Sequence, residues 1–331
     1  MMSTHLPGSR GLSRRTFNIA LASQLAAARA LCAQPAPWPQ RAVTFVSPVA
    51  VGGSTDRLGR AITNGLAEVW RQPAVVDSRP GAGGAIAAAM VARAEPDGYT
   101  ALFAQVSLVQ APHLQQGLQY SLQDFAGVSL LGTVPVLLAV GAQSPYQTLA
   151  DYLQAGKRAS PPVRFGSFGV GSSFHIYGET LVRDSGARLE HVAYKGEAAA
   201  VADVLGGHIE STFVSVSTAL PLIKAGKLRA LAVVGQPVSS LPGIPSFSSQ
   251  GFPRLDVRGW FGIVVPRKVP SAIREKMASD MRTVATRPDV VEAFGAMSGD
   301  LLALDAQQTD NFLAQENEKW RKLITELGIK A

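Results

Sequence analysis

The sequence predicts an α/β protein with two domains, on three observations. Short apolar segments rich in β-branched residues alternate with segments of helical periodicity along most of the chain. Turns rich in glycine and serine follow several of the expected strands. The chain has 331 residues, of which 47% are hydrophobic, so it can form more than one core. Since strands that alternate with helices usually pair in parallel, we expect parallel sheets covered by helices.

Residues 43–60, VTFVSPVAVGGSTDRLGR, show this pattern most clearly. A β-branched strand at 43–47 is followed by two glycines and by Ser54, the first of three candidate N-caps of a helix. Four apolar residues at near-helical spacing predict the buried face of that helix: Leu58, Ile62, Leu66 and Val69. The N–H groups of such a turn and the helix dipole favour an anion, although an ordinary connection between a strand and a helix explains the same residues.

The alternation continues to the C-terminal third of the chain. We expect further strands at residues 74–77, 99–105, 134–140, 163–167, 189–194, 209–214, 228–234 and 260–265. We expect further helices at residues 85–94, 148–157, from 174, between 196 and 206, and at 219–225, 271–286, 288–296 and 306–327. The last helix has an apolar face, which we interpret as a clamp on the first domain: Leu313, Trp320, Ile324 and Leu327.

Residues 1–33 have the features of a signal peptide with a twin-arginine motif. The motif is SRRTF at 13–17, a moderately apolar run covers 19–31, and the segment contains no Asp or Glu. We expect export to the periplasm with cleavage near Ala33, or after Ala30. The single cysteine in this segment does not predict a lipid anchor, because the residue before it is leucine rather than a small residue.

The charge of the exported chain is nearly balanced. Four of the 31 basic residues lie in the signal segment, which leaves 27 basic and 24 acidic residues. The basic residues are dispersed, without the clusters interleaved with aromatic side chains that are typical of nucleic-acid-binding proteins. No apolar run beyond the signal segment approaches the length of a membrane span. We therefore expect a soluble protein that does not bind nucleic acid.

Motifs for cofactor binding and catalysis are incomplete. Gly-Ala-Gly at 81–83 lies between a strand and a helix, but Ile86 stands where a dinucleotide-binding motif needs its third glycine. No phosphate-binding loop occurs, and no two of the five histidines have metal-ligand spacing. We expect no cofactor, no metal and no catalysis. One alternative is a hydrolase that uses Ser172 and His175, although a capping or packing role also explains that histidine.

Eight stretches of the chain resemble one protein family in register. They are SPVAVGGSTDRLGRAI, VVDSRPGAGGAIAAAMVARAEPDGYTALF, DFAGVSLLGTVPVLLAV, VRFGSFGVGSSFHIYGE, HVAYKGEAAAVADVLGGHIESTF, LIKAGKLRALAVV, VRGWFGIVVP and ENEKWRKLITELGIK. Over nearly the whole mature chain the sequence is similar to the Bug-type extracytoplasmic solute receptors, the substrate-binding proteins of tripartite tricarboxylate transporters. The resemblance implies a type II periplasmic-binding-protein fold, in which two α/β domains joined by crossing strands close on a ligand.

The resemblance also implies the domain division, the ligand and the partners. We expect residues 34–136 and 258–331 in domain 1 and residues 137–257 in domain 2. The implied ligand is a dicarboxylic acid, an amino acid or another small organic acid, and the implied partners are the membrane components of the transporter. We expect a monomer. The alternative is a receptor that reports its ligand to a signalling partner such as a sensor kinase, because the same clamshell closure serves both functions.

The resemblance assigns ligand-binding residues to four turns. The first anion-holding turn is matched by Val51, Gly52, Gly53 and Ser54. The turn after the third strand is matched by Gln105 and Ser107, and the glycine-serine turn of the second domain by Ser167, Gly171 and Ser172. The tyrosine-lysine-glycine stretch is matched by Tyr194 and Lys195. Backbone amides and hydroxyls of these turns are expected to hold the oxygens of a carboxylate.

Three positions depart from the family pattern. Val49 stands where an aromatic residue is common, and Ser78 replaces a usual asparagine. Val214 and Ser215 follow Phe213 where the family usually has an aspartate. Without that acid at the rim of the cleft, an uncharged or purely acidic ligand fits better than one with an amino group.

Overall fold

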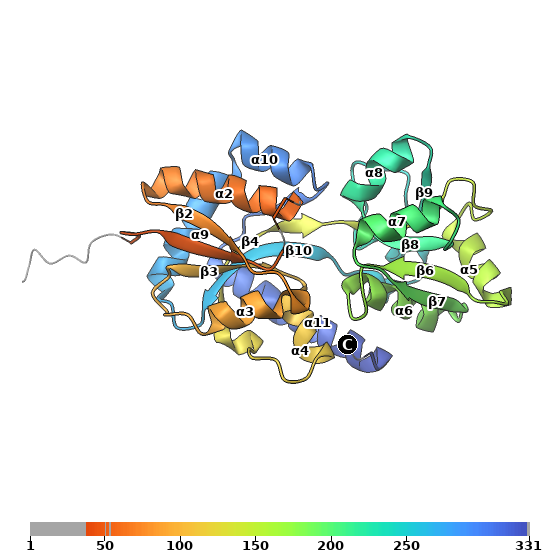
Figure 1. Cartoon of the computed structure of the whole chain (residues 1–331), viewed down its shortest axis with the longest axis horizontal. Helices are drawn as coiled ribbons and strands as arrows, with labels where there is room; N and C mark the ends of the chain where they lie inside the picture. Colours follow the sequence, from red (N-terminus) through yellow and green to blue (C-terminus); the bar gives the residue numbers. More distant parts are fainter. Residues whose placement is uncertain (1–37, 50, 53, 330–331) are drawn as a thin grey trace, which may run out of the picture. The chain divides into compact units, whose positions relative to one another are not determined.

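The computed structural model describes residues 38–49, 51–52 and 54–329, without the side chain of Ser54. The expected signal segment and its cleavage near Ala33 lie outside the described residues, as does Gly53. Residues Arg41–Ala331 form one compact unit, which contains two β-sheets (Figure 1).

The first sheet has six strands in the order β11-β4-β10-β3-β1-β2. Their bounds are β1 Val43–Ser47, β2 Ala74–Ser78, β3 Thr100–Gln105, β4 Phe125–Val134, β10 Gly259–Pro266 and β11 Asp300–Leu301. One face is covered by α2 (Ser54–Trp70), α9 (Ser271–Ala285) and α10 (Pro288–Gly295) (Figure 1). The other face is covered by α3 (Ala85–Ala92), α4 (Ser107–Leu114) and α11 (Ala306–Leu327).

The second sheet has five strands in the order β7-β6-β8-β5-β9. Their bounds are β5 Val136–Gly141, β6 Val163–Ser167, β7 Leu189–Ala193, β8 Ser211–Ser215 and β9 Leu228–Val234. The helices are α5 (Leu149–Arg158), α6 (Ser173–Ser185), α7 (Glu197–Leu205) and α8 (Val216–Lys224). Buried residues of α5 and α6 belong to one hydrophobic cluster, and those of α7 and α8 belong to a second cluster.

Both sheets are mixed, so the expectation of parallel sheets is confirmed for three neighbouring strands of each sheet and is wrong for the others. In the first sheet β1 pairs in parallel with β2 and β3, but β10 runs antiparallel to β3 and β4. In the second sheet β6 pairs in parallel with β7 and β8, but β5 runs antiparallel to β8 and β9. The antiparallel strands β4, β5, β9 and β10 are those through which the chain enters and leaves the second sheet.

Most expected elements are confirmed within a few residues, but strands β4 and β11 and helix α4 were not expected. The expected strand at 134–140 corresponds to β5, which begins at Val136 after Pro135, and strand β4 before that proline belongs to the other sheet and was not expected. Helix α4 was not expected, since its sequence contains Pro112. In α2 the side chain of Val69 is 43% exposed and Trp70 is buried in its place.

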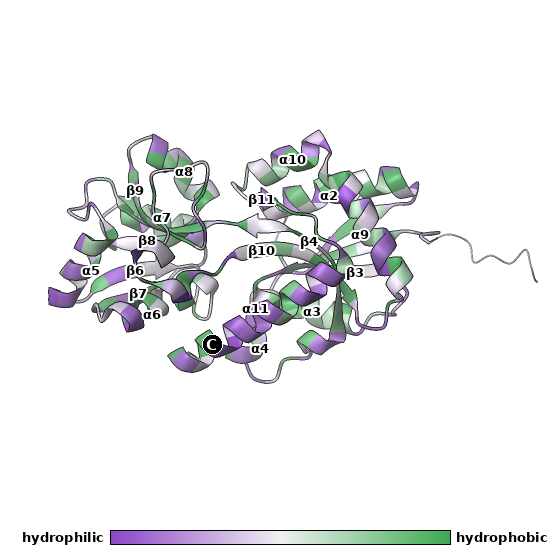
Figure 2. Cartoon of the chain, turned by 180° about the vertical axis from the view of Figure 1, so that it is seen from behind, coloured by the Kyte–Doolittle hydropathy of each residue, from purple (hydrophilic) through white to green (hydrophobic). Residues whose placement is uncertain are grey.

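Helix α11 carries hydrophilic and hydrophobic residues on different faces (Figure 2). Its residues Leu313, Trp320 and Ile324 are buried, as the apolar periodicity predicts. The helix packs against β4 and α4 of the first sheet, and it also contacts α6, where the ring centroids of Tyr177 and Trp320 lie 6.0 Å apart. It therefore bridges the two sheets instead of clamping the first domain alone. Among the described residues no helix has both the length and the apolarity that a membrane crossing requires.

Candidate functional site

The chain passes between the two sheets twice. Strand β4 ends at Val134 and β5 begins at Val136, while β9 ends at Val234 and β10 begins at Gly259. We call these two connections the crossing. They lie side by side, because Gly259 pairs with Val134 in the first sheet and Val234 pairs with Val136 in the second.

The strand register places the ends of six parallel strands at the crossing. Strand β10 begins there and runs antiparallel to β3, so β3 and its parallel neighbours β1 and β2 all end there. In the second sheet Val136 pairs with Ser215, the last residue of β8. Strands β6 and β7 are parallel to β8 and end on the same side. The turns after these strands therefore gather on one flank of the crossing, which is the arrangement that commonly binds ligands in α/β proteins.

The turn between β1 and α2 is held by an acid of its own helix. The Gly52 amide donates to Oδ2 of Asp56 at 3.0 Å, and Nε of Arg60 donates to the same oxygen at 3.0 Å. The Arg60 hydrogen bond holds the pKa of Asp56 below its ordinary value. The Gly52 amide is thus engaged inside the turn, while the side chain of Val51 is 66% exposed.

The structure brings Gln105 and Ser107 together with residues that the sequence did not single out. Both line a small depression beside Pro48, at the end of β1, and Gly84, in the turn after β2. Gly84 has φ +98°, and a Cβ there would lie 3.2 Å from both Pro48 Cβ and Ser107 Oγ. A glycine is required for this close approach. The run of glycines before α3 is the sequence feature that could have predicted that the turn after β2 takes part in this depression.

In the second sheet, Ser167 is the centre of a hydrogen-bonded cluster. It is the last residue of β6, and its side chain is fully buried. Its Oγ lies 2.7 Å from Nε2 of His191, accepts from the Gly169 amide at 3.1 Å and lies 3.4 Å from Oγ of Ser172. Ser172 is the N-cap of α6, where its Oγ accepts from the His175 amide at 3.3 Å.

Two stacked imidazoles support this turn. The Gly171 amide donates to Nδ1 of His175 at 3.1 Å, and the ring centroids of His175 and His191 lie 3.9 Å apart. Burial, together with the neighbouring His175, lowers the pKa of His191 to about 4. Sequence reasoning missed His191, because only the pairing of β6 with β7 brings it to Ser167.

Tyr194 and Lys195 follow β7 on the same edge. The Tyr194 amide donates to the Ser167 carbonyl at 2.9 Å, and its hydroxyl donates to Oδ2 of Asp203 in α7 at 2.7 Å. Burial and this acceptor raise the pKa of Tyr194 to about 12. The tyrosine hydroxyl is therefore engaged within its own sheet, whereas Lys195 is exposed.

The hydrogen bonds of Ser172 and His175 do not form a nucleophile–base pair. Ser172 Oγ caps the helix, and His175 Nδ1 accepts from a backbone amide. The serine–histidine contact that does exist joins His191 to Ser167, whose side chain has no solvent exposure. A hydrolase needs a nucleophile that substrate can reach, so this geometry gives no support to that alternative.

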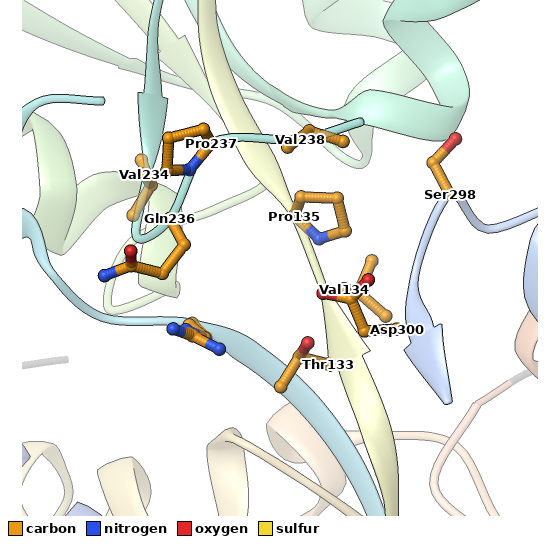
Figure 3. Close-up of a pocket in the computed structure, with 10 residues that line it drawn as sticks. Thr133, Val134, Pro135, Val234, Gln236, Pro237, Val238, Ser298 and Asp300 are labelled. Atoms are coloured by element: carbon orange, nitrogen blue, oxygen red, sulfur yellow. The ribbon is translucent and has the colours of Figure 1, made fainter. Parts of the chain in front are cut away.

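A pocket lies on the other flank of the crossing (Figure 3). Its lining comes from the β4–β5 connection, the residues after β9, and the turn into β11: Thr133, Val134, Pro135, Val234, Gln236, Pro237, Val238, Arg258, Ser298 and Asp300. In the first sheet, β10 separates β4 and β11 from β3. In the second sheet, β5 separates β9 from β8. None of the expected site residues that the structure describes lines this pocket.

Two α/β sheets joined by a double crossing, with the ends of parallel strands from both sheets gathered beside it, define a solute-binding protein of the periplasmic type. The chain matches the family model described as tripartite tricarboxylate transporter family receptor over residues 58–329. It belongs to this family of periplasmic solute receptors.

Similar proteins span nearly the same length. Protein BugT of Bordetella pertussis is 31% identical over 298 residues, which are 88% of this chain and 91% of BugT. A Rhodopseudomonas palustris protein solved with adipate is 28% identical, with a TM-score of 0.77 over 89% of this chain and 99% of that chain. MatC of the same organism, solved with malate, is 26% identical, with a TM-score of 0.71 over 87% and 100%.

Proposed function

We propose that the mature chain, residues 34–331, captures a small carboxylate in the periplasm and presents it to the membrane components of a tripartite transporter. Residues 34–136 with 258–331 and residues 137–257 act as two domains that close about the crossing. The chain works as a monomer, without catalysis or a cofactor. The residues proposed to surround the ligand are Val51, Gly52, Gly53, Ser54, Gln105, Ser107, Ser167, Gly171, Ser172, Tyr194 and Lys195.

The observation that carries this proposal is the convergence of six strand ends at the crossing. The turns there supply hydroxyls, backbone amides and helix N-termini, which together suit a carboxylate. The likeness to proteins solved with adipate and malate supports the same ligand class. Closure about a pair of crossing segments is a common way for two domains to enclose a ligand.

Thermal unfolding with a panel of acids tests the proposal. The mature chain is heated with dicarboxylates, tricarboxylates, amino acids, aromatic acids and neutral analogues. A ligand at 100 times its Kd stabilises the folded state by about 2.7 kcal/mol, which raises the melting temperature by about 5 °C. We expect at least one carboxylate to give such a shift while its neutral amide does not. No shift from any acid would contradict the proposal.

A pair of variants at Val51 checks where the ligand binds. This side chain is 66% exposed, so a polar replacement leaves the core intact. Val51→Asp adds a negative charge to the first turn and should abolish the shift given by the carboxylate. Val51→Asn has nearly the same shape without the charge and should retain most of the shift. Equal shifts in the two variants would place the carboxylate away from this turn.

A further inference from the structure

Glu197 places a carboxylate on the same edge of the second sheet as the glycine-serine turn. It is the first residue of α7, and its Oε2 accepts from the backbone N–H of Ser215 at 3.2 Å and from Oγ of Ser215 at 2.7 Å. Ser215 is the last residue of β8 and pairs with Val136 at the crossing. The family resemblance predicted that the rim of the cleft near Ser215 lacks an acid. In the structure Glu197, from another element, supplies an acid there.

Two further hydroxyl groups, from the first turn of α8, contact the serine that donates to this carboxylate. Oγ of Ser215 donates to Glu197, and it lies 2.9 Å from Oγ1 of Thr218 and 3.2 Å from Oγ of Ser217. All four residues are half-buried, so the group is neither sealed in the core nor fully solvated. Carboxylate and hydroxyl oxygens that converge in this way are hydrogen-bond acceptors.

The negative charge of this group is not neutralised within the described part of the chain. No lysine, arginine or histidine there forms an ion pair with Glu197. Its Oε1 also has no hydrogen-bond partner among those residues, although Oε2 has two. One carboxylate oxygen at the edge of the proposed site is therefore available to a donor.

We propose that Glu197, with the hydroxyls of Ser217 and Thr218, receives an ammonium group of the ligand. An ammonium has three N–H donors and a positive charge, which match one carboxylate oxygen and two hydroxyl oxygens. The ligand would then be an amino carboxylate whose acid end meets the other turns. This inference rests on the proposed function and narrows it, because Glu197 would repel the second acid group of a dicarboxylate.

The size of the effect follows from the electrostatics of a partly solvated site. Two unit charges in direct hydrogen-bond contact in such surroundings interact strongly enough to change an affinity at least tenfold. An ammonium at that end of the ligand is attracted by the charge of Glu197, and a carboxylate in its place is repelled. We therefore expect amino carboxylates to bind at least tenfold more tightly than dicarboxylates of equal chain length.

Calorimetric titration of the mature protein tests this inference. Two pairs of probes compare a dicarboxylate with an ω-amino acid of equal chain length: glutarate with 5-aminopentanoate, and adipate with 6-aminohexanoate. A further set compares the dicarboxylates succinate and glutarate with the α-amino acids aspartate, glutamate and 2-aminobutanoate. We expect the wild-type chain to bind an amino compound more tightly than the matched dicarboxylate. The variant Glu197→Gln should lower the affinity for that amino compound about tenfold and raise the affinity for the dicarboxylate. Glu197→Asp, which keeps the charge, should retain the wild-type preference.

The control is Glu190→Gln, which removes the same charge from the exposed side chain of a residue near the start of β7, away from the strand ends. It should leave both affinities unchanged. A wild-type preference for the dicarboxylate, or an equal change of both affinities in Glu197→Gln, would overturn the inference and leave the proposed function standing. Failure of every acid to bind would overturn the inference and contradict the proposed function as well.

Discussion

Ser167 and His191 are joined by a contact of 2.7 Å between Oγ and Nε2, beneath the turn that leads into α6. The imidazole of His191 stacks on His175, whose own Nδ1 accepts from the Gly171 amide. The two stacked rings thus fix the conformation of a turn that we place in the ligand site. Protonation of His191 would put a charge into this buried stack.

The low pKa of His191 predicts a loss of stability in acid. The pKa is about 4 in the folded chain and about 6.5 in an unfolded chain, so the unfolded state binds more protons between these values. The free energy of unfolding should therefore fall as the pH is lowered from about 6.5 to about 4. Urea unfolding at a series of pH values measures this slope.

The variant His191→Gln should flatten that slope, since glutamine does not titrate. The control is His208→Gln, which removes a histidine whose side chain is 73% exposed and which bonds Asp203. It should leave the slope between about pH 6.5 and about pH 4 nearly as steep as in the wild-type chain. Equal slopes in the wild-type and His191→Gln proteins would show that another group dominates.

The cap of α6 predicts a moderate stability change at Ser172. Its Oγ accepts from the His175 amide, and loss of such a cap costs about 1 kcal/mol of unfolding free energy. Ser172→Ala should lose about this amount in chemical denaturation, whereas Ser172→Asp keeps an acceptor oxygen and should retain most of the stability. If both variants are equally stable, the hydroxyl does not act as a cap.

The contact of α6 with the second sheet predicts a severe effect at Gly178. A Cβ on this residue would lie 1.9 Å from Cε2 of Phe165, and the phenyl ring is itself buried against other rings. Gly178→Ala should lower the unfolding free energy by about 3 kcal/mol, because the helix must move off the sheet. The control Gly295→Ala, a helical position with nothing within 4 Å, should leave it unchanged or raise it by up to about 1 kcal/mol.

The sequence predicts most elements of this fold because their signals are local. Thr148 and Asp151 form the expected capping box at the start of α5, and Gly328 ends α11 in a left-handed conformation. The division at Pro135 was missed, since the apolar run continues across it. Only the pairing with β10 on one side and β8 on the other shows that this proline separates two sheets.

The candidate site was predictable where it consists of single turns and was not predictable where it joins distant strands. Ser167 ends strand β6 and Ser172 lies in the turn after it, so their neighbourhood is encoded in a short stretch of sequence. The contact of Ser167 with His191 and that of Glu197 with Ser215 depend on strand order, which the residue pattern does not specify. The structure is needed to find both.

The most direct test of the central claim is backbone hydrogen exchange with and without the acid that raises the melting temperature most. If the ligand lies between the two sets of strand ends, exchange should slow together in residues 49–54 and 168–173. The amides of residues 236 and 238, which line the pocket of Figure 3, should change little. Protection confined to one turn, or found only at that pocket, would contradict a ligand held between the two sheets beside the crossing.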